Sequence, residues 1–294
     1  MKTRIILPVL SRNHKDIDHT FKDQKRWNEV YGKNLLSVIA SDPERFNLEN
    51  LWLTQSQKDL LALLYAKIQG SNTPLKILDY GSGRGEFSIF LAKLGAEVVG
   101  IDIGEDLVKL ATITAKQNEV DCSFICGSID DLPFDDASFD TVVGCAILHH
   151  LPKQGVKKAI HEAYRVLKSG GTAYFTEPIE NSPIFDYLQN TIPVGNPEAT
   201  NYRPSILNKK AWQKHLAEAD DRALSNAELI FAKAGFTSVR FQYYGMFIRL
   251  KRLWNNTLFI QLLTKMDHYA SHPNSPIRKL SQSVLVSYKK EDAG

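Results

Sequence analysis

Cysteine is scarce in this chain of 294 residues. It has only Cys122, Cys126 and Cys145, and they come without a second cysteine pair or a histidine pair at the spacing of a zinc site. An odd number of cysteines also argues against a disulfide framework. We therefore expect buried, reduced thiols and no metal site.

Long hydrophobic runs and blocks of like charge are missing as well. The apolar stretch after Met1 is too short for a signal peptide, and every later segment of membrane-spanning length contains charges, so we expect a cytoplasmic protein without a transmembrane segment. The net charge of +3 is small, and no five like charges follow one another. This pattern argues against a nucleic-acid partner and favours a small-molecule substrate.

The chain does contain a regular alternation of short apolar strands and amphipathic helices from Leu75 onward. The alternation predicts strands at residues 75–80, 96–102, 122–127, 139–145, 172–177, 238–244 and 283–288. The helix before residue 172 is expected to stop at Ser169-Gly170-Gly171, and a later one to begin at the capping box Ser225–Glu228. The expected fold is α/β: a doubly wound, mostly parallel seven-stranded sheet with an antiparallel last strand.

Four parts are expected along the chain. Residues 1–70 are predicted to be a helical extension, 71–180 the core, 181–224 a loop and helix on the substrate side, and 225–294 the rest of the sheet with a helical insertion at 246–280. The basic and apolar residues of 247–260 suit a membrane-surface helix, a dimer face or packing on the sheet. We favour packing, because the apolar residues are spread around the helix, and a homodimer stays open.

The most informative stretch is a buried strand that ends in a glycine loop. Asp79 is followed by glycines at 81, 83 and 85, and Asp102 ends the next strand. Alternate glycines let the backbone approach a ligand closely, and the following helix offers its N–H groups to the same place. Asp102 is placed to accept hydrogen bonds from the ribose hydroxyls of a nucleoside. The nicotinamide and flavin fingerprint G-x-G-x-x-G would need a third glycine where Glu86 stands, so NAD and FAD are not expected.

The spacing D-x-G-x-G-x-G from Asp79 resembles the first motif of class I S-adenosylmethionine-dependent methyltransferases, which have a Rossmann-like fold. The likeness extends over residues 75–180. Residues 127–140 are similar to the segment that reads G-D-A-E-x-L-P-F before S-F-D in the ubiquinone and menaquinone group (methyltransferase type 11), and 162–171 resembles the family's next helix end, an architectural segment. The cofactor's ammonium suits Asp79, and its carboxylate suits backbone donors.

The resemblance implies a set of cofactor-binding residues. In the family, an acidic side chain accepts from the adenine amino group and the next residue's N–H bonds a ring nitrogen. Here Ser128 stands in place of the acid and Ile129 takes the backbone role; either Ser128 or Asp130 is left to accept the amino group. The full expected set is Asp79, Gly81, Ser82, Gly83, Gly85, Asp102, Ile103, Ser128, Ile129 and Cys145.

Catalytic candidates follow the fourth and fifth predicted strands, where the strand order reverses and ligands of such sheets bind. His149 and His150 come after the fourth strand, and family members often have a histidine there; either histidine could instead bond backbone carbonyls. Glu177 ends the fifth strand and either faces the substrate or caps the loop. Candidate substrate contacts are Trp27, Tyr31, Tyr187 and Tyr202, although the first two would equally anchor the N-terminal helices.

The expected activity is metal-independent methyl transfer from S-adenosyl-L-methionine to an oxygen, nitrogen or carbon of a small molecule, with S-adenosyl-L-homocysteine as product. Residues 1–70 and 178–204 are expected to close over the substrate. Two alternatives stay open: C-methylation of a prenylated quinone precursor at the membrane surface, and cofactor binding without catalysis. The acceptor molecule is not fixed by the fold.

Overall fold

The computed structural model describes residues 54–180, 203–218, 223–248, 256–272 and 274–292, together with 187, 190, 191, 193 and 250. These residues group into two compact units. One, the core unit, lies within His14–Glu177, Ala227–Phe241 and Leu285–Gly294; the other lies within Pro178–Asn226 and Gln242–Val284. The N-terminal extension before residue 54 lies outside the described residues.

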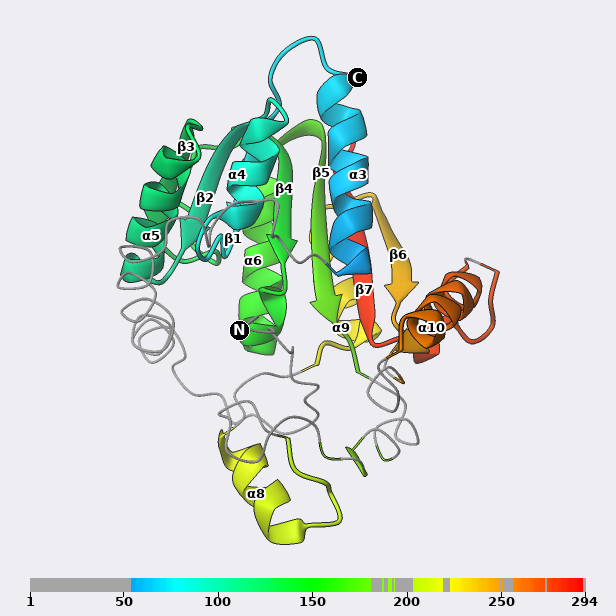
Figure 1. Cartoon of the computed structure of the whole chain (residues 1–294). Helices are drawn as coiled ribbons and strands as arrows, with labels where there is room; N and C mark the ends of the chain where they lie inside the picture. Colours follow the sequence, from blue (N-terminus) through cyan, green and yellow to red (C-terminus); the bar gives the residue numbers. More distant parts are fainter. Residues whose placement is uncertain are drawn as a thin grey trace. The chain divides into compact units, whose positions relative to one another are not determined.

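The sheet has seven strands in the order β3-β2-β1-β4-β5-β7-β6 (Figure 1). They are β1 (Lys76–Tyr80), β2 (Glu97–Asp102), β3 (Cys122–Cys126), β4 (Phe139–Cys145), β5 (Leu167–Pro178), β6 (Ser238–Tyr244) and β7 (Ser283–Lys289). The pairs β1–β2, β2–β3, β1–β4 and β4–β5 are parallel.

The last strand is antiparallel. Gly170 at the start of β5 donates to the carbonyl of Glu291, whereas Ile179 after its end donates to that of Gln282, so numbers rise along β5 as they fall along β7. The predicted doubly wound, seven-stranded sheet with an antiparallel last strand is confirmed.

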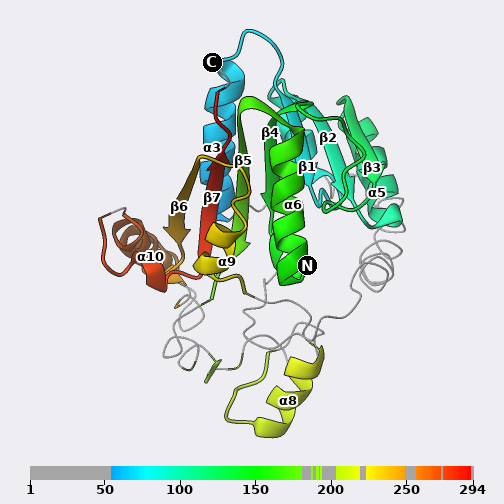
Figure 2. The same cartoon turned by 180° about the vertical axis from the view of Figure 1, so that it is seen from behind.

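Helices cover both faces of the sheet. On one face lie α3 (Gln55–Gln69), α4 (Glu86–Lys93) and α5 (Glu105–Gln117), and on the other α6 (Lys153–Val166) and α9 (Asn226–Phe231) (Figures 1 and 2). Right-handed crossovers require this split, because the chain moves from β1 toward β3 and then, from β4, in the opposite direction. The other unit contains α8 (Lys209–Glu218) and α10 (Thr257–Ala270). None of the helices built from described residues is long and apolar enough to cross a membrane.

The predicted end of α6 is wrong. The helix ends at Val166, and Leu167 already has extended backbone, so Ser169-Gly170-Gly171 belong to β5 instead of forming a helix stop. The reason is tertiary: Gly170 donates to Glu291, and Gly171 accepts from Lys290, so the segment pairs with residues that follow β7. A glycine pair alone does not distinguish these two uses.

Candidate active site

The glycine loop joins β1 to α4 in a conformation that favours glycine. Gly81, Gly83 and Gly85 have φ of 62°, 53° and 82°. A Cβ added at Gly81 would lie 2.3 Å from Cδ1 of Ile147. The loop therefore needs glycine for its dihedral angles and, at Gly81, for a close approach to the loop after β4.

Asp102 ties this loop to the end of β2. Its Oδ2 accepts from the Gly83 N–H at 2.9 Å and its Oδ1 from the Gly104 N–H at 2.8 Å. Burial raises the pKa of this carboxyl, while the amide hydrogen bonds oppose the shift. The N–H of Ile103 also hydrogen-bonds this carboxylate, and a carboxylate has about four acceptor positions, so at least one is left for a ligand's hydroxyl.

Asp79 is a buried carboxyl beneath the loop. Its Oδ2 accepts a 2.6 Å hydrogen bond from the Ser88 hydroxyl of α4. Burial, together with the nearby acids Asp102 and Glu86, raises its pKa to about 7, and the hydrogen bond from Ser88 opposes the shift. An acid surrounded by other acids suits a cationic ligand group such as an ammonium.

Ser82 gives an independent indication of a ligand at the loop. Its hydroxyl oxygen is buried and has no hydrogen-bond partner among the residues that the structure describes. A buried hydroxyl without a partner costs free energy unless a ligand or water satisfies it. The acidic Asp79, the tight glycine loop and this unsatisfied hydroxyl fit the amino acid end of S-adenosylmethionine.

The segment expected at the adenine places its two alternative acceptors together. The Ser128 hydroxyl donates a hydrogen bond to Oδ1 of Asp130, so the two side chains are in direct contact. Ile129 between them is buried, with 6% of its surface exposed.

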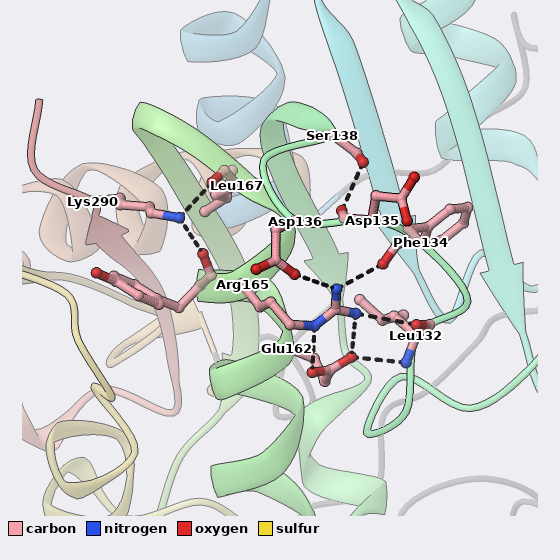
Figure 3. Close-up of polar contacts among 10 residues, drawn as sticks. Leu132, Phe134, Asp135, Asp136, Ser138, Glu162, Arg165, Leu167 and Lys290 are labelled. Carbon is pink, nitrogen blue, oxygen red and sulfur yellow. Dashed lines mark hydrogen bonds and ion pairs between the residues drawn. The ribbon is translucent and has the colours of Figure 1, made fainter. Parts of the chain in front are cut away.

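Arg165 of α6 holds the rest of that segment in place. Its guanidinium donates to both carboxylate oxygens of Glu162, to the carbonyls of Leu132 and Phe134, and to Asp136 at distances of 2.7–3.1 Å (Figure 3). Glu162 in turn accepts from the Leu132 N–H at 2.9 Å. These partners raise the pKa of Arg165. The helix end thus fixes the loop as well as the next strand, a role that the sequence did not reveal.

His149, after the end of β4, and Glu177, at the end of β5, form a buried pair. Nδ1 of His149 lies 2.8 Å from Oε2 of Glu177, and both side chains are buried. Glu177 also accepts from the backbone N–H groups of Ile147, Leu148 and His149. Of the two expected roles for Glu177, the structure shows the loop cap.

His150 and Cys145 line the same region differently. The centroid of the His150 ring lies 4.0 Å from that of the His149 ring, and the electrostatic effect of His150 lowers the pKa of Asp102. Burial raises the pKa of the Cys145 thiol, and Thr176 and Gln57 hydrogen-bond it. This burial disfavours the reactive thiolate form of Cys145.

The remaining predicted residues fall into three groups. Trp27, Tyr31 and Tyr202 lie outside the described residues; Tyr187 is exposed and belongs to the other unit. Ile103 lies next to Asp102, and its carbonyl is 3.7 Å from the Cys126 thiol.

All three cysteines are free. The expectation of a buried thiol is wrong for Cys126, which is exposed because it ends β3 at the edge of the sheet. No cluster of three or more potential metal ligands occurs in the described part of the chain.

Sequence reasoning missed Ser88 and Gln57. Ser88 has a weak signal, since it is a polar residue between Phe87 and Ile89 on the buried face of α4. Gln57 carries only the signal of the α3 capping box, where its side chain accepts from the Thr54 N–H.

Comparison with known proteins finds methyltransferases. A family model described as a methyltransferase domain matches residues 77–171. The demethylmenaquinone methyltransferase of Lactococcus lactis is 28% identical over 235 residues, which cover 76% of this chain and 89% of that protein. The ubiquinone biosynthesis O-methyltransferase of Coxiella burnetii is 30% identical over 143 residues, covering 46% of this chain and 60% of that protein. A solved methyltransferase from Methanosarcina mazei has a TM-score of 0.49 at 19% identity, over 77% of this chain and 97% of that one.

The fold, the glycine loop and the family match define a methyltransferase domain. Residues 77–171 match a methyltransferase domain, and the resemblance to S-adenosylmethionine-dependent methyltransferases seen in the sequence is confirmed. It is an enzyme of the transferase class.

Proposed function

We propose that this enzyme methylates an oxygen, nitrogen or carbon of a small-molecule acceptor by direct displacement and without a metal. The observation that carries the proposal is the convergence of Asp79, the glycine loop and Asp102 where β1 and β2 end, directly beside the loop that bears His149. Ligands of doubly wound sheets bind at this switch point.

Each part of the cofactor has a chemically matched partner. Asp79 takes the ammonium, the loop amides with Ser82 take the carboxylate, and Asp102 takes the ribose hydroxyls. At the adenine, the linked Ser128 and Asp130 accept from the amino group and Ile129 donates its N–H. The whole proposed set is Asp79, Gly81, Ser82, Gly83, Gly85, Asp102, Ile103, Ser128, Ile129 and Cys145, with S-adenosylhomocysteine held as product.

The residues after β4 act on the acceptor. When bound, the cofactor supplies a methyl group that its sulfonium already activates. Alignment of the acceptor with that methyl group contributes up to about 7–11 kcal/mol. Proton removal by His149 adds about 10²–10⁴-fold for an acceptor that is un-ionised at neutral pH. His150 lines the cofactor side of the same loop.

A second candidate is C-methylation of a prenylated quinone precursor. It is favoured by the name of the Lactococcus lactis relative, whose match extends over three quarters of this chain. Under either candidate, Trp27, Tyr31, Tyr187 and Tyr202 are proposed substrate contacts, and residues 1–70 and 178–204 are proposed to close over the acceptor. The four-part division at 70, 180 and 224 stays part of this proposal.

The test has two stages. Calorimetry with S-adenosylmethionine and S-adenosylhomocysteine measures binding, and formation of S-adenosylhomocysteine with a panel of phenols, amines and a demethylmenaquinone analogue measures turnover. Turnover only with the quinone would select the second candidate. Binding without turnover on any acceptor would favour the non-catalytic alternative, and absence of binding would refute the proposal.

A further inference from the structure

The carboxylate of Glu177 is surrounded by hydrogen-bond donors. Oε1 accepts from the N–H groups of Ile147 at 2.9 Å and Leu148 at 2.8 Å, and Oε2 from the N–H of His149 at 3.3 Å. These amides open the 3₁₀ turn η4 (Leu148–His150), whose first N–H groups have no partner within the turn. The ring of His149 is the fourth hydrogen-bond partner of the Glu177 carboxylate, so all four acceptor positions of that carboxylate are used.

The fourth contact determines which ring nitrogen of His149 carries the proton. An ionised carboxylate only accepts hydrogen bonds, so Nδ1, which lies 2.8 Å from Oε2, must be the protonated nitrogen. In a neutral imidazole the lone pair is then on Nε2.

A second tie from β5 fixes the same loop. The N–H of Ala146 donates to the carbonyl of Thr176 at 2.7 Å, and Ala146 has a φ of 57°. A non-glycine residue in this conformation is held there by its surroundings. The end of β5 therefore sets both the backbone path after β4 and the orientation of the His149 ring.

We propose that Glu177 is a positioning residue that fixes His149 in its Nδ1–H tautomer and so keeps Nε2 free to accept the acceptor's proton. Glu177 itself does not meet substrate, because its side chain is fully buried and its oxygens are occupied. This inference rests on the proposed function, since it assigns the base within that reaction.

In the proposed methyl transfer, each bond that breaks is matched by a bond that forms or by a lone pair. The acceptor's O–H or N–H proton moves to Nε2, and the electron pair of that bond forms the new bond to the methyl carbon. The electron pair of the broken carbon–sulfur bond stays on sulfur, which becomes a neutral thioether. The resulting imidazolium of His149 is stabilised by Glu177 until the proton leaves to solvent.

The direct test is the tautomer of His149. Nitrogen-15 NMR of the full-length chain labelled at histidine, with the signal assigned by comparison with His149→Gln, distinguishes the two tautomers. We expect Nδ1–H in the unaltered protein. An Nε2–H tautomer would overturn the inference, whether or not the enzyme shows activity and whether or not any Glu177 variant folds.

The second test is Glu177→Gln, with Glu180→Gln, an exposed glutamate nearby in sequence, as the matched control. A glutamine can turn its NH₂ toward Nδ1 and so favours the Nε2–H tautomer. We expect kcat to fall by about 10²-fold or more for an un-ionised acceptor, with S-adenosylhomocysteine affinity retained and the acidic limb of the pH–rate profile shifted. An unchanged kcat and pH profile in Glu177→Gln would refute the positioning role. Loss of cofactor binding by the unaltered enzyme would instead refute the proposed function.

Discussion

The Ser88 hydroxyl donates a 2.6 Å hydrogen bond to Oδ2 of Asp79, and both residues are buried. The bond joins the first turn of α4 to the end of β1, on either side of the glycine loop. It partly offsets the cost of burying Asp79, whose pKa nevertheless rises to about 7. In the folded protein, burial therefore makes the ionised form of Asp79 unfavourable until a cation binds beside it.

Asp79 predicts a specific dependence of stability on pH. Its folded pKa lies above the unfolded value of 3.8, so its stabilising contribution is complete below about pH 4 and is lost as the pH rises through 7. Asp79→Asn removes this loss and should have a higher melting temperature than the unaltered protein at pH 8 but not at pH 4. Thermal unfolding without cofactor at both pH values measures it, with Asp121→Asn as an exposed control. Parallel changes in all three proteins would contradict the prediction.

Asp102→Ala should weaken cofactor binding and loosen the glycine loop. The substitution removes contacts to a charged group, worth about 1.5–3 kcal/mol, and leaves the N–H groups of Gly83 and Gly104 without their partner. We expect S-adenosylhomocysteine affinity to fall by about 10-fold or more, as measured by calorimetry. Glu105→Gln, at an exposed neighbouring acid, is the control. Equal affinity in Asp102→Ala and the unaltered chain would remove Asp102 from the site.

Gly81→Ala and Gly83→Ala separate backbone strain from steric conflict. Both residues have positive φ, so each alanine costs about 1–2 kcal/mol of backbone strain. A Cβ at Gly81 also collides with Ile147, whereas a Cβ at Gly83 meets no atom within 4 Å. Denaturant unfolding should show the greater loss of stability in Gly81→Ala, with partial recovery on adding Ile147→Ala. Equal losses in the two single variants would mean that the collision relaxes without cost.

Arg165→Met should release the segment from residue 128 to 136. The variant leaves the carbonyls of Leu132 and Phe134 and the carboxylate of Glu162 without their donor, a cost of about 1–3 kcal/mol for each group that stays buried. Hydrogen exchange in this segment should accelerate, and affinity for adenosine-containing ligands should fall. Lys153→Met, at the exposed start of α6, serves as the control. If exchange in the segment keeps its rate, Arg165 does not hold it.

The sequence by itself determined the class of fold and predicted where the candidate site lies. Strand and helix periodicity indicated the doubly wound sheet, and the spacing of Asp79, Gly81, Gly83, Gly85 and Asp102 predicted the cofactor loop. These features are local: glycine conformations, alternation and turns depend on neighbours within a few residues, so the pattern carries them directly.

Only the tertiary structure decided which side chains form hydrogen bonds with one another. Glu177 and His149 are separated by 28 positions, and Arg165 and Phe134 by 31, yet each pair is in hydrogen-bond contact. From the sequence, Glu177 could equally face the substrate or cap the loop. The burial of its side chain and the number of N–H groups that donate to it depend on where the strands end in space. It also misplaced the end of α6, since only the pairing of Gly170 and Gly171 with residues beyond β7 turns that segment into a strand. Long-range hydrogen bonds satisfy buried polar groups, and no local pattern encodes their partners.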